Sequence, residues 1–193
     1  MKILGICGSH RKKKNTYKAL TGALEPSEAE MDILQVSDLD VSPCRACYDA
    51  CSTDPYTCII DDDLTILIEK MKDADAILLA SPLCSPLLVP SRLGTIIERL
   101  SCLSFFESMR RKEAEQVLCD KPCGIITVSG GSEPLALLQL LTNFALMLGL
   151  EVMTLKRYPY FGAWVKSPVE EDREGMDQVR KIGALLKDSI TSR

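Results

Sequence analysis

At 193 residues, the chain is long enough to bury a substantial core as a single domain, and its 46% hydrophobic and 26% charged residues are ordinary for a globular protein. The formal net charge of −4 disfavours nucleic acid as a partner, because there is no global basic field. His10 is the only histidine, which disfavours hydrolases with a histidine base and histidine-rich zinc sites. The N-terminal sequence MKILGICGSH has no long apolar segment or cleavage site, which predicts a cytoplasmic, reducing location without membrane insertion.

Short runs rich in Ile, Leu and Val alternate along the chain with longer stretches of helical character. Strands are predicted at residues 2–7, 31–36, 76–80, 124–128 and 151–155. Helices are predicted near residues 16–24, 61–74, 91–107, 134–148 and 174–190. The strand runs lack strict polar alternation, which indicates that helices cover both faces of the sheet. Five successive β-then-α units predict one three-layer α/β domain, residues 1–193, with a parallel, doubly wound sheet.

The loop after the first predicted strand has the composition of a phosphate site. In such folds, ligands bind beyond the carboxyl ends of the strands. The hydroxyls of Ser9 and Thr16, with backbone N–H groups near a helix start at Asn15, would donate hydrogen bonds to a phosphate. The Arg11 guanidinium would add a charged donor to the phosphate oxygens. The sequence matches neither a Walker loop nor the dinucleotide fingerprint. The residues alone therefore leave two alternatives, a phosphate site or a solvated basic turn in which Asn15 or Thr16 caps the helix.

The loop after the second predicted strand, at about residues 42–60, is rich in cysteine. Its spacing is C-x2-C-x3-C-x6-C, at Cys44, Cys47, Cys51 and Cys58. A compact cysteine set without histidine is typical of an iron–sulfur cluster. Structural zinc more often uses two separated pairs, and four free thiols or a redox disulfide are further alternatives.

The remaining candidate residues are predicted to be structural. The five other cysteines lie in apolar surroundings and are predicted to be small buried hydrophobes, except that Cys84 falls in a ligand-side loop: Cys7, Cys84, Cys102, Cys119 and Cys123. Glu98 and Arg99 are interpreted as an ion pair on a helix surface. Trp164 is predicted to pack a loop or a subunit interface rather than stack on a substrate.

Several stretches resemble those of the iron–sulfur flavoproteins, a branch of the flavodoxin-like NAD(P)H-dependent FMN reductase superfamily. GICGSHRKKKNT resembles the phosphate loop of that family, and PCRACYDACSTDPYTCIIDDD resembles its compact cysteine motif. ADAILLASPLCSPLLVPSRLGTIIERL is similar to its flavin-facing loop with the flanking strand and helix, and KPCGIITVSGG to its fourth strand and glycine loop. YFGAWVKSPVEEDREGM is similar to its C-terminal segment.

The resemblance implies a flavodoxin-like fold with a five-stranded parallel sheet in the order 2-1-3-4-5. It also implies one FMN per subunit and one [4Fe–4S] cluster on Cys44, Cys47, Cys51 and Cys58. The FMN phosphate would be held by Ser9, Arg11, Asn15 and Thr16. The flavin ring would be bordered by Pro82, Leu83, Cys84, Ser85, Ser129, Gly130, Gly131 and Ser132.

With both cofactors, the protein would transfer electrons between a one-electron donor such as ferredoxin and a small-molecule two-electron acceptor. NAD(P)H is an alternative donor, and the resemblance implies a homodimer or homotetramer. No catalytic side chain is predicted, because the cofactors carry the chemistry. Two alternatives stay open: a cluster-free NAD(P)H-dependent FMN or quinone reductase, and a non-enzymatic zinc-stabilised domain. Cys84, Pro86 and the short glycine loop motivate the second.

Overall fold

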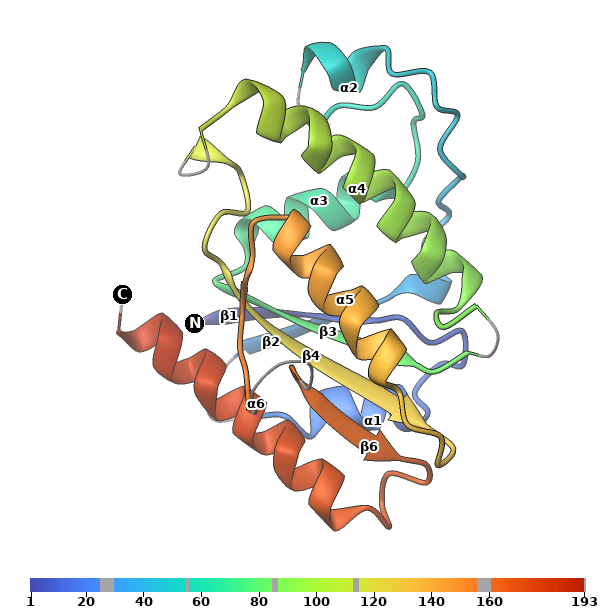
Figure 1. The fold of residues 1–193 in the computed structure, drawn as a ribbon, viewed down its shortest axis with the longest axis vertical. Coiled ribbons are helices and arrows are strands. Elements are labelled where there is room, and N and C mark those ends of the chain that lie inside the picture. Colours follow the sequence, from blue (N-terminus) through green and yellow to red (C-terminus); the bar gives the residue numbers. More distant parts are fainter. Residues whose placement is uncertain (25–29, 55, 85–86, 113–114, 156–160, 193) are drawn as a thin grey trace.

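The computed structural model describes residues 1–24, 30–54, 56–84, 87–112, 115–155 and 161–192 (Figure 1). Its strands are β1 (Lys2–Cys7), β2 (Glu30–Gln35), β3 (Ala76–Pro82), β4 (Pro122–Ser129), β5 (Glu151–Val152) and β6 (Ala163–Lys166). Its α-helices are α1 (Asn15–Thr21), α2 (Ala50–Thr53), α3 (Leu64–Asp73), α4 (Ser91–Arg110), α5 (Leu135–Met147) and α6 (Arg173–Thr191), with a 3-10 turn η1 (Val36–Asp38). None of the helices in these ranges is long and apolar enough to cross a membrane.

The sheet has the predicted parallel order, β2-β1-β3-β4-β5. Its fifth position is split, because β5 and β6 both pair with β4, in parallel and at different heights. The second segment, β6, was not predicted. Gly162, immediately before it, has a φ of +100°, and a Cβ there would lie 2.5 Å from the carbonyl oxygen of Ile125. A glycine is therefore needed where the chain comes back against β4.

Helices cover both faces of the sheet, as predicted. On one face α3, α4 and α5 bury apolar side chains such as Leu67, Ile96 and Leu141. On the other, α1 and α6 bury Leu20 and Ile182. In Figure 1 the strands run across the middle, with α3 and α4 above them and α1 and α6 below. The result is a three-layer sandwich with two apolar cores.

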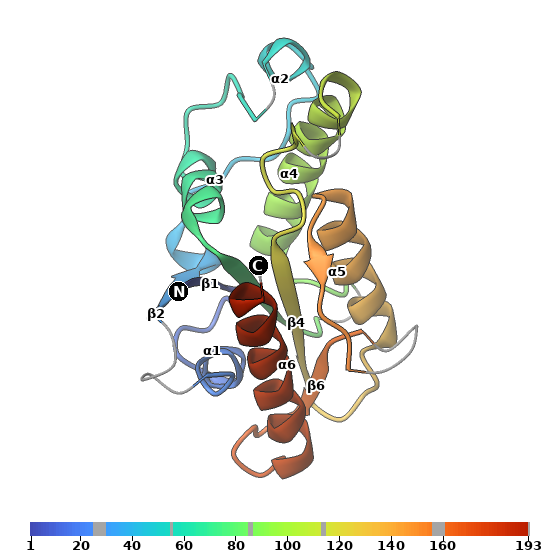
Figure 2. The ribbon, with the colours of Figure 1, turned by 90° about the vertical axis from the view of Figure 1, so that its left-hand side faces the viewer.

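The long helix α4 extends beyond the sheet. Both views show its C-terminal half beside the short helix α2, at the end of the molecule away from the strands (Figures 1 and 2). The segment from η1 to α3, which contains α2, therefore packs against α4 rather than against the sheet. Asp62 helps to start α3, because its Oδ1 accepts a hydrogen bond from the Leu64 N–H over 3.2 Å.

Candidate functional site

The loop after β1 is compact and partly buried. Ser9 is only 5% exposed, and its Oγ accepts a hydrogen bond from the Arg11 N–H over 3.1 Å. Thr16 is also buried, at the start of α1, whereas the Arg11 side chain is exposed. The Asn15 amide donates to the Ser167 hydroxyl, in the loop between β6 and α6. The structure thus brings the four residues predicted for phosphate onto one short loop and the helix that follows it.

The loop after β3 is tied to the neighbouring strand. The Leu83 N–H donates to the Val128 carbonyl over 2.8 Å, and the Cys84 N–H donates to the Leu88 carbonyl over 2.9 Å. Pro82 ends β3, and the Cys84 side chain is exposed. Ser85 and Pro86, named in the sequence predictions, lie outside the described residues. The described part of the loop is therefore a short extended segment at the carboxyl end of the sheet, with its one thiol facing solvent.

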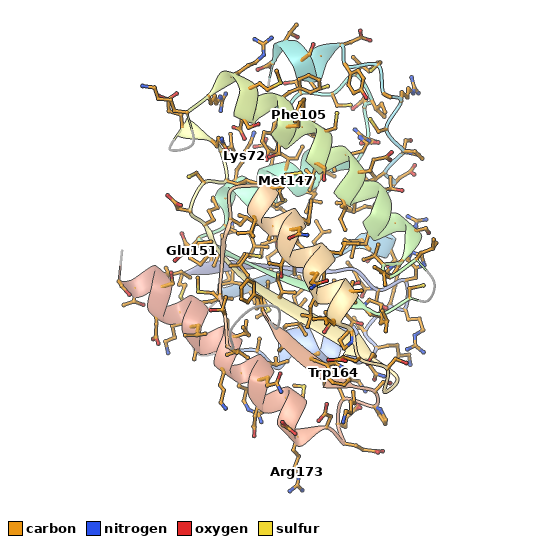
Figure 3. The ribbon with its side chains drawn as sticks, viewed as in Figure 1. Lys72, Phe105, Met147, Glu151, Trp164 and Arg173 are labelled. Carbon is orange, nitrogen blue, oxygen red and sulfur yellow. The ribbon has the colours of Figure 1, made fainter. Side chains whose placement is uncertain are left out.

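The turn after β4 leaves space on its outer side. Added Cβ atoms at Gly130 and Gly131 would meet no other heavy atom within 4 Å, and Gly131 has a φ of +117°. Ser129 Oγ donates to the Ser132 carbonyl over 2.7 Å and accepts from the Trp164 indole N–H over 2.8 Å. Figure 3 shows Trp164 on β6 beside this turn. Both glycines of the turn thus lie beside open space.

The loop after β6 contacts both the start of α1 and the turn after β4. The Ser167 N–H donates to the Ser129 carbonyl over 2.7 Å, and Ser167 also receives the hydrogen bond from Asn15. Lys18 of α1 and Glu170 of the loop after β6 form a further, exposed ion pair between these two segments. Sequence reasoning predicted that Trp164 packs a loop or a subunit interface without naming the turn after β4, and it did not name Ser167. The available signal was the similarity of the segment around them to a family segment that follows the glycine loop.

The four cysteines of the second loop line one small cavity. Its lining is completed by residues of the loop and of α4, so that the full set is Cys44, Arg45, Cys47, Tyr48, Cys51, Cys58, Ile60, Arg99, Cys102 and Leu103. All nine cysteines of the chain lie among the described residues, and none of them forms a disulfide. The cavity brings together the four cysteines predicted as ligands, and none of the four is in a disulfide in this structure.

A fifth cysteine, Cys102, belongs to this cavity. It lines the cavity together with Cys44 and Cys51. Burial, followed by the neighbouring Cys51 and Cys44 thiols, raises the pKa of Cys102 to about 12. Burial also raises the pKa of Cys51. Cys102 was predicted to be a small buried hydrophobe; it is instead a half-buried thiol of the cysteine site.

Two residues of α4 hold the cysteine loop, and neither has the role predicted for it. Arg99 is 2% exposed, and its guanidinium donates to the Ser42 carbonyl over 3.1 Å and pairs with the Asp62 carboxylate. Glu98 Oε2 accepts from the Cys44 N–H over 3.3 Å. The predicted surface pair of Glu98 and Arg99 is therefore wrong, because each side chain contacts the loop instead of the other.

The Asp62 carboxylate is the ion-pair partner of Arg99 in the contact between α4 and the cysteine loop. Burial alone would raise its pKa, but the Ser42 N–H, the Arg99 guanidinium and the Leu64 N–H together hold the pKa of Asp62 below its ordinary value. Asp62 therefore stays ionised and fixes both ends of the cysteine loop against α4.

The backbone around the first two cysteines takes an unusual form. Ala46 and Tyr48 have φ angles of 49° and 55°, a left-handed conformation that costs free energy for residues other than glycine. At this turn the Ala46 N–H donates to Cys44 Sγ over 3.4 Å. Backbone N–H groups directed at sulfur are a recurrent means of stabilising metal-bound thiolates.

A single metal ion does not fit the arrangement. Among the described residues, no three His, Cys, Asp or Glu side chains converge closely enough to hold one ion. A mononuclear zinc site needs four ligands around one centre. A four-iron cluster takes each thiolate on a different iron, so its ligands stand farther apart around a shared cavity. The described residues therefore show no preformed site for a single ion.

The parallel order 2-1-3-4-5, with its loops gathered at the carboxyl edge of the sheet, defines a flavodoxin-like protein. The chain matches the NADPH-dependent FMN reductase family over residues 1–165, and it belongs to that family. It is accordingly a flavin-dependent oxidoreductase. This agrees with the family resemblance found in the sequence.

Known relatives agree with this assignment. The chain is 33% identical over 197 residues to an iron-sulfur flavoprotein of Methanosarcina thermophila, covering 98% of this chain and 95% of the relative. It is 30% identical over 192 residues to an iron-sulfur flavoprotein of Archaeoglobus fulgidus, covering 93% and 92%. The crystal structure of RosB with a bound 8-demethyl-8-formylriboflavin-5'-phosphate intermediate has a TM-score of 0.76 at 18% identity, covering 100% of this chain and 79% of RosB. An NADH:FMN oxidoreductase in its apo form has a TM-score of 0.65 at 16% identity, covering 100% and 91%.

Proposed function

We propose that this protein binds FMN and a [4Fe–4S] cluster and transfers electrons between a one-electron donor, such as a ferredoxin, and a two-electron small-molecule acceptor. The family supports the FMN, and the names of the relatives from Methanosarcina thermophila and Archaeoglobus fulgidus support the cluster. A cluster supplies one-electron transfer and FMN supplies exchange of one or two electrons, so a protein with both converts between the two kinds of partner.

The observation that carries the proposal is the shared cavity of Cys44, Cys47, Cys51 and Cys58. The residues around it prepare the site for a cluster in two ways. The Ala46 N–H is directed at Cys44 Sγ, and it would stabilise the negative charge of a ligated sulfur. The buried pair of Arg99 and Asp62 keeps the loop that carries the cysteines against α4.

The loops at the carboxyl edge of the sheet support a site for FMN. Ser9 and Thr16, both buried, and the exposed Arg11 would hold the phosphate. The open space beside Gly130 and Gly131 would admit the flavin ring, and their backbone N–H groups would stabilise negative charge on it. The remaining residues proposed for the flavin are Asn15, Pro82, Leu83, Cys84, Ser85, Ser129 and Ser132.

Exposed apolar side chains near the cysteine loop support a homodimer or homotetramer. Tyr48, Phe105 and Met109 are 53%, 55% and 69% exposed, and Tyr48 contacts Phe106 with ring centroids 5.7 Å apart. Figure 3 shows Phe105 on α4, at the end of the molecule that carries the cysteine loop. Burial of these side chains in a second subunit would also shield the cluster site from water.

An anaerobic reductive titration tests the proposal. A chain with one FMN and one cluster takes up about three electrons, two on the flavin and one on the cluster. Each step is followed by absorbance, with flavin bands above a broad sulfur-to-iron absorption. Uptake of about two electrons, with flavin bands alone, would contradict the cluster.

A cluster-free NAD(P)H-dependent FMN or quinone reductase is the second candidate, and the family match is the observation that favours it. Such a protein would be yellow, would contain no iron, and would be bleached by NAD(P)H alone. A zinc-stabilised domain without flavin is the third candidate. Among the described residues no three His, Cys, Asp or Glu side chains converge on one ion, which disfavours it, and one zinc per chain without retained FMN would favour it.

A further inference from the structure

Ser167, the first residue after β6, lies between the two parts of the proposed FMN site. One part is the loop after β1 with the start of α1, which would hold the phosphate, and the other is the turn after β4, which would border the flavin ring. The Asn15 amide, at the start of α1, donates a hydrogen bond to the Ser167 hydroxyl. The Ser167 N–H donates to the carbonyl of Ser129, the last residue of β4, over 2.7 Å. One residue therefore contacts both parts of the site.

The position of Ser167 is fixed by the residues on either side of it. Lys166 is paired with Ser129 in the parallel contact between β6 and β4. Val169 is 2% exposed and packs in the apolar core that α1 and α6 cover. Asp172 accepts hydrogen bonds from the Lys166 N–H over 2.6 Å and from a backbone N–H in the first turn of α6. Because the loop is held at three points, a displacement of Ser167 would move the residues that it contacts instead of being absorbed by the loop.

Both contacts of Ser167 lead directly to residues proposed for FMN. The Ser129 hydroxyl donates to the Ser132 carbonyl over 2.7 Å, so Ser129 joins the beginning of the turn to its end. On the other side, Asn15 is followed by Thr16, which is 3% exposed and is proposed for the phosphate. A continuous path of hydrogen bonds thus runs from the start of α1 through Ser167 to the turn after β4.

We propose that Ser167 is a positioning residue that couples the two parts of the FMN site, so that a phosphate group in the first strengthens binding of the flavin ring in the second. This inference rests on the proposed function. A phosphate would fix the start of α1, and through the Ser167 hydroxyl it would also fix the turn after β4. The ring would then bind to a turn that is already ordered, at a smaller cost in free energy. The coupling therefore favours FMN over riboflavin beyond the contacts that the phosphate itself makes.

The test divides FMN into two separate probes, riboflavin and inorganic phosphate. The dissociation constant for riboflavin is measured by quenching of flavin fluorescence on the full-length protein freed of FMN. Each measurement is made in phosphate and in chloride at the same ionic strength. A change in the riboflavin constant between the two salts reports the coupling, because the two probes are not joined to each other.

The parent protein is compared with Ser167→Ala, Ser167→Thr and Ser108→Ala. Ser167→Ala keeps the N–H that donates to Ser129 and removes only the hydroxyl that contacts Asn15, whereas Ser167→Thr retains a hydroxyl. Ser108→Ala is the matched control, because Ser108 is also an exposed serine and its hydroxyl donates to the Phe105 carbonyl within α4.

We expect phosphate to lower the riboflavin dissociation constant of the parent protein roughly 2- to 10-fold, which is the effect of one hydrogen bond. In Ser167→Ala, the constant measured in chloride should stay at the parent value, and phosphate should no longer lower it. Ser167→Thr and Ser108→Ala should respond to phosphate as the parent does.

Three results would overturn the inference. The first is a phosphate effect in Ser167→Ala equal to that of the parent, and the second is the absence of any phosphate effect in the parent. The third is a riboflavin constant that rises in chloride in Ser167→Ala while the phosphate effect persists, because Ser167 would then only shape the turn. A parent protein that binds neither FMN nor riboflavin would overturn the proposed flavin site as well, so the two failures are distinguishable.

Discussion

Arg99 and Asp62 form a buried ion pair that joins α4 to the end of the cysteine loop, with side-chain exposures of 2% and 8%. Because Arg99 also donates to the Ser42 carbonyl and Asp62 accepts from the Ser42 N–H and the Leu64 N–H, both charges are hydrogen-bonded on several sides. A buried pair of this kind is costly to break, since removal of one partner leaves the other charge uncompensated.

We therefore expect Arg99→Ala to lower the free energy of unfolding by about 3–5 kcal/mol. The measurement is urea unfolding followed by circular dichroism. Arg180→Ala is the matched control, because Arg180 forms an exposed pair with Asp177 within α6 and such pairs contribute about 0–1 kcal/mol. Equal losses in the two variants would contradict the role given to the buried pair.

Asp62 also predicts a pH dependence of stability. Its pKa in the folded protein is lower than in the unfolded chain, so the carboxylate contributes stability that is fully present above the unfolded pKa, at about 4. That contribution is lost as the pH falls through the lower, folded value. We expect the difference in unfolding free energy between the parent and Asp62→Asn to be constant near neutral pH and to shrink below about pH 4. A difference that is the same throughout the acid range would contradict this assignment.

Trp164 is expected to support flavin binding through the turn after β4. Trp164→Phe keeps an aromatic side chain but removes the indole N–H that donates to Ser129 Oγ. Such a hydrogen bond contributes about 0.5–1.5 kcal/mol. The dissociation constant for FMN, measured by quenching of flavin fluorescence, should rise roughly 2- to 10-fold. Tyr17→Phe, a conservative change on α1, is the control and should leave the constant unchanged. An unaltered constant in Trp164→Phe would show that the turn keeps its shape without this bond.

Arg11 should distinguish FMN from riboflavin. A charge-assisted bond to phosphate contributes about 1.5–3 kcal/mol, so Arg11→Ala should weaken FMN binding roughly 10- to 100-fold and leave riboflavin binding unchanged. Lys14→Ala is the comparison, because Lys14 is exposed in the same basic run and makes no side-chain capping bond to α1. Equal effects on the two flavins, or equal effects of the two substitutions, would remove Arg11 from the phosphate site.

The sequence predicted the central strands well, because β1, β3 and β4 are apolar runs that are buried on both faces. It missed β6, which is only Ala163–Lys166, has mixed polarity, and depends on the close approach of Gly162 to Ile125. No local pattern shows that such a short segment will continue the edge of a sheet begun by β5.

The candidate site was predicted where its residues are neighbours in sequence and missed where the fold brings them together. Spacing alone pointed to the four cysteines of the loop, but Cys102 reaches them only because α4 packs against that loop. The sequence contained a signal that Arg99 faces the apolar side of its helix, which the interpretation as a surface ion pair overlooked. It is three residues after Ile96 and four before Leu103, both buried, which places it on the apolar side of a helix.

The central claim is that the loop cysteines hold one four-iron cluster, and counting iron and acid-labile sulfide per chain under argon tests it most directly. We expect about four of each in the parent protein and a small fraction of that in Cys47→Ser, with Cys119→Ser unaffected. A parent protein without iron and sulfide, or a Cys47→Ser variant with undiminished iron, would contradict the account.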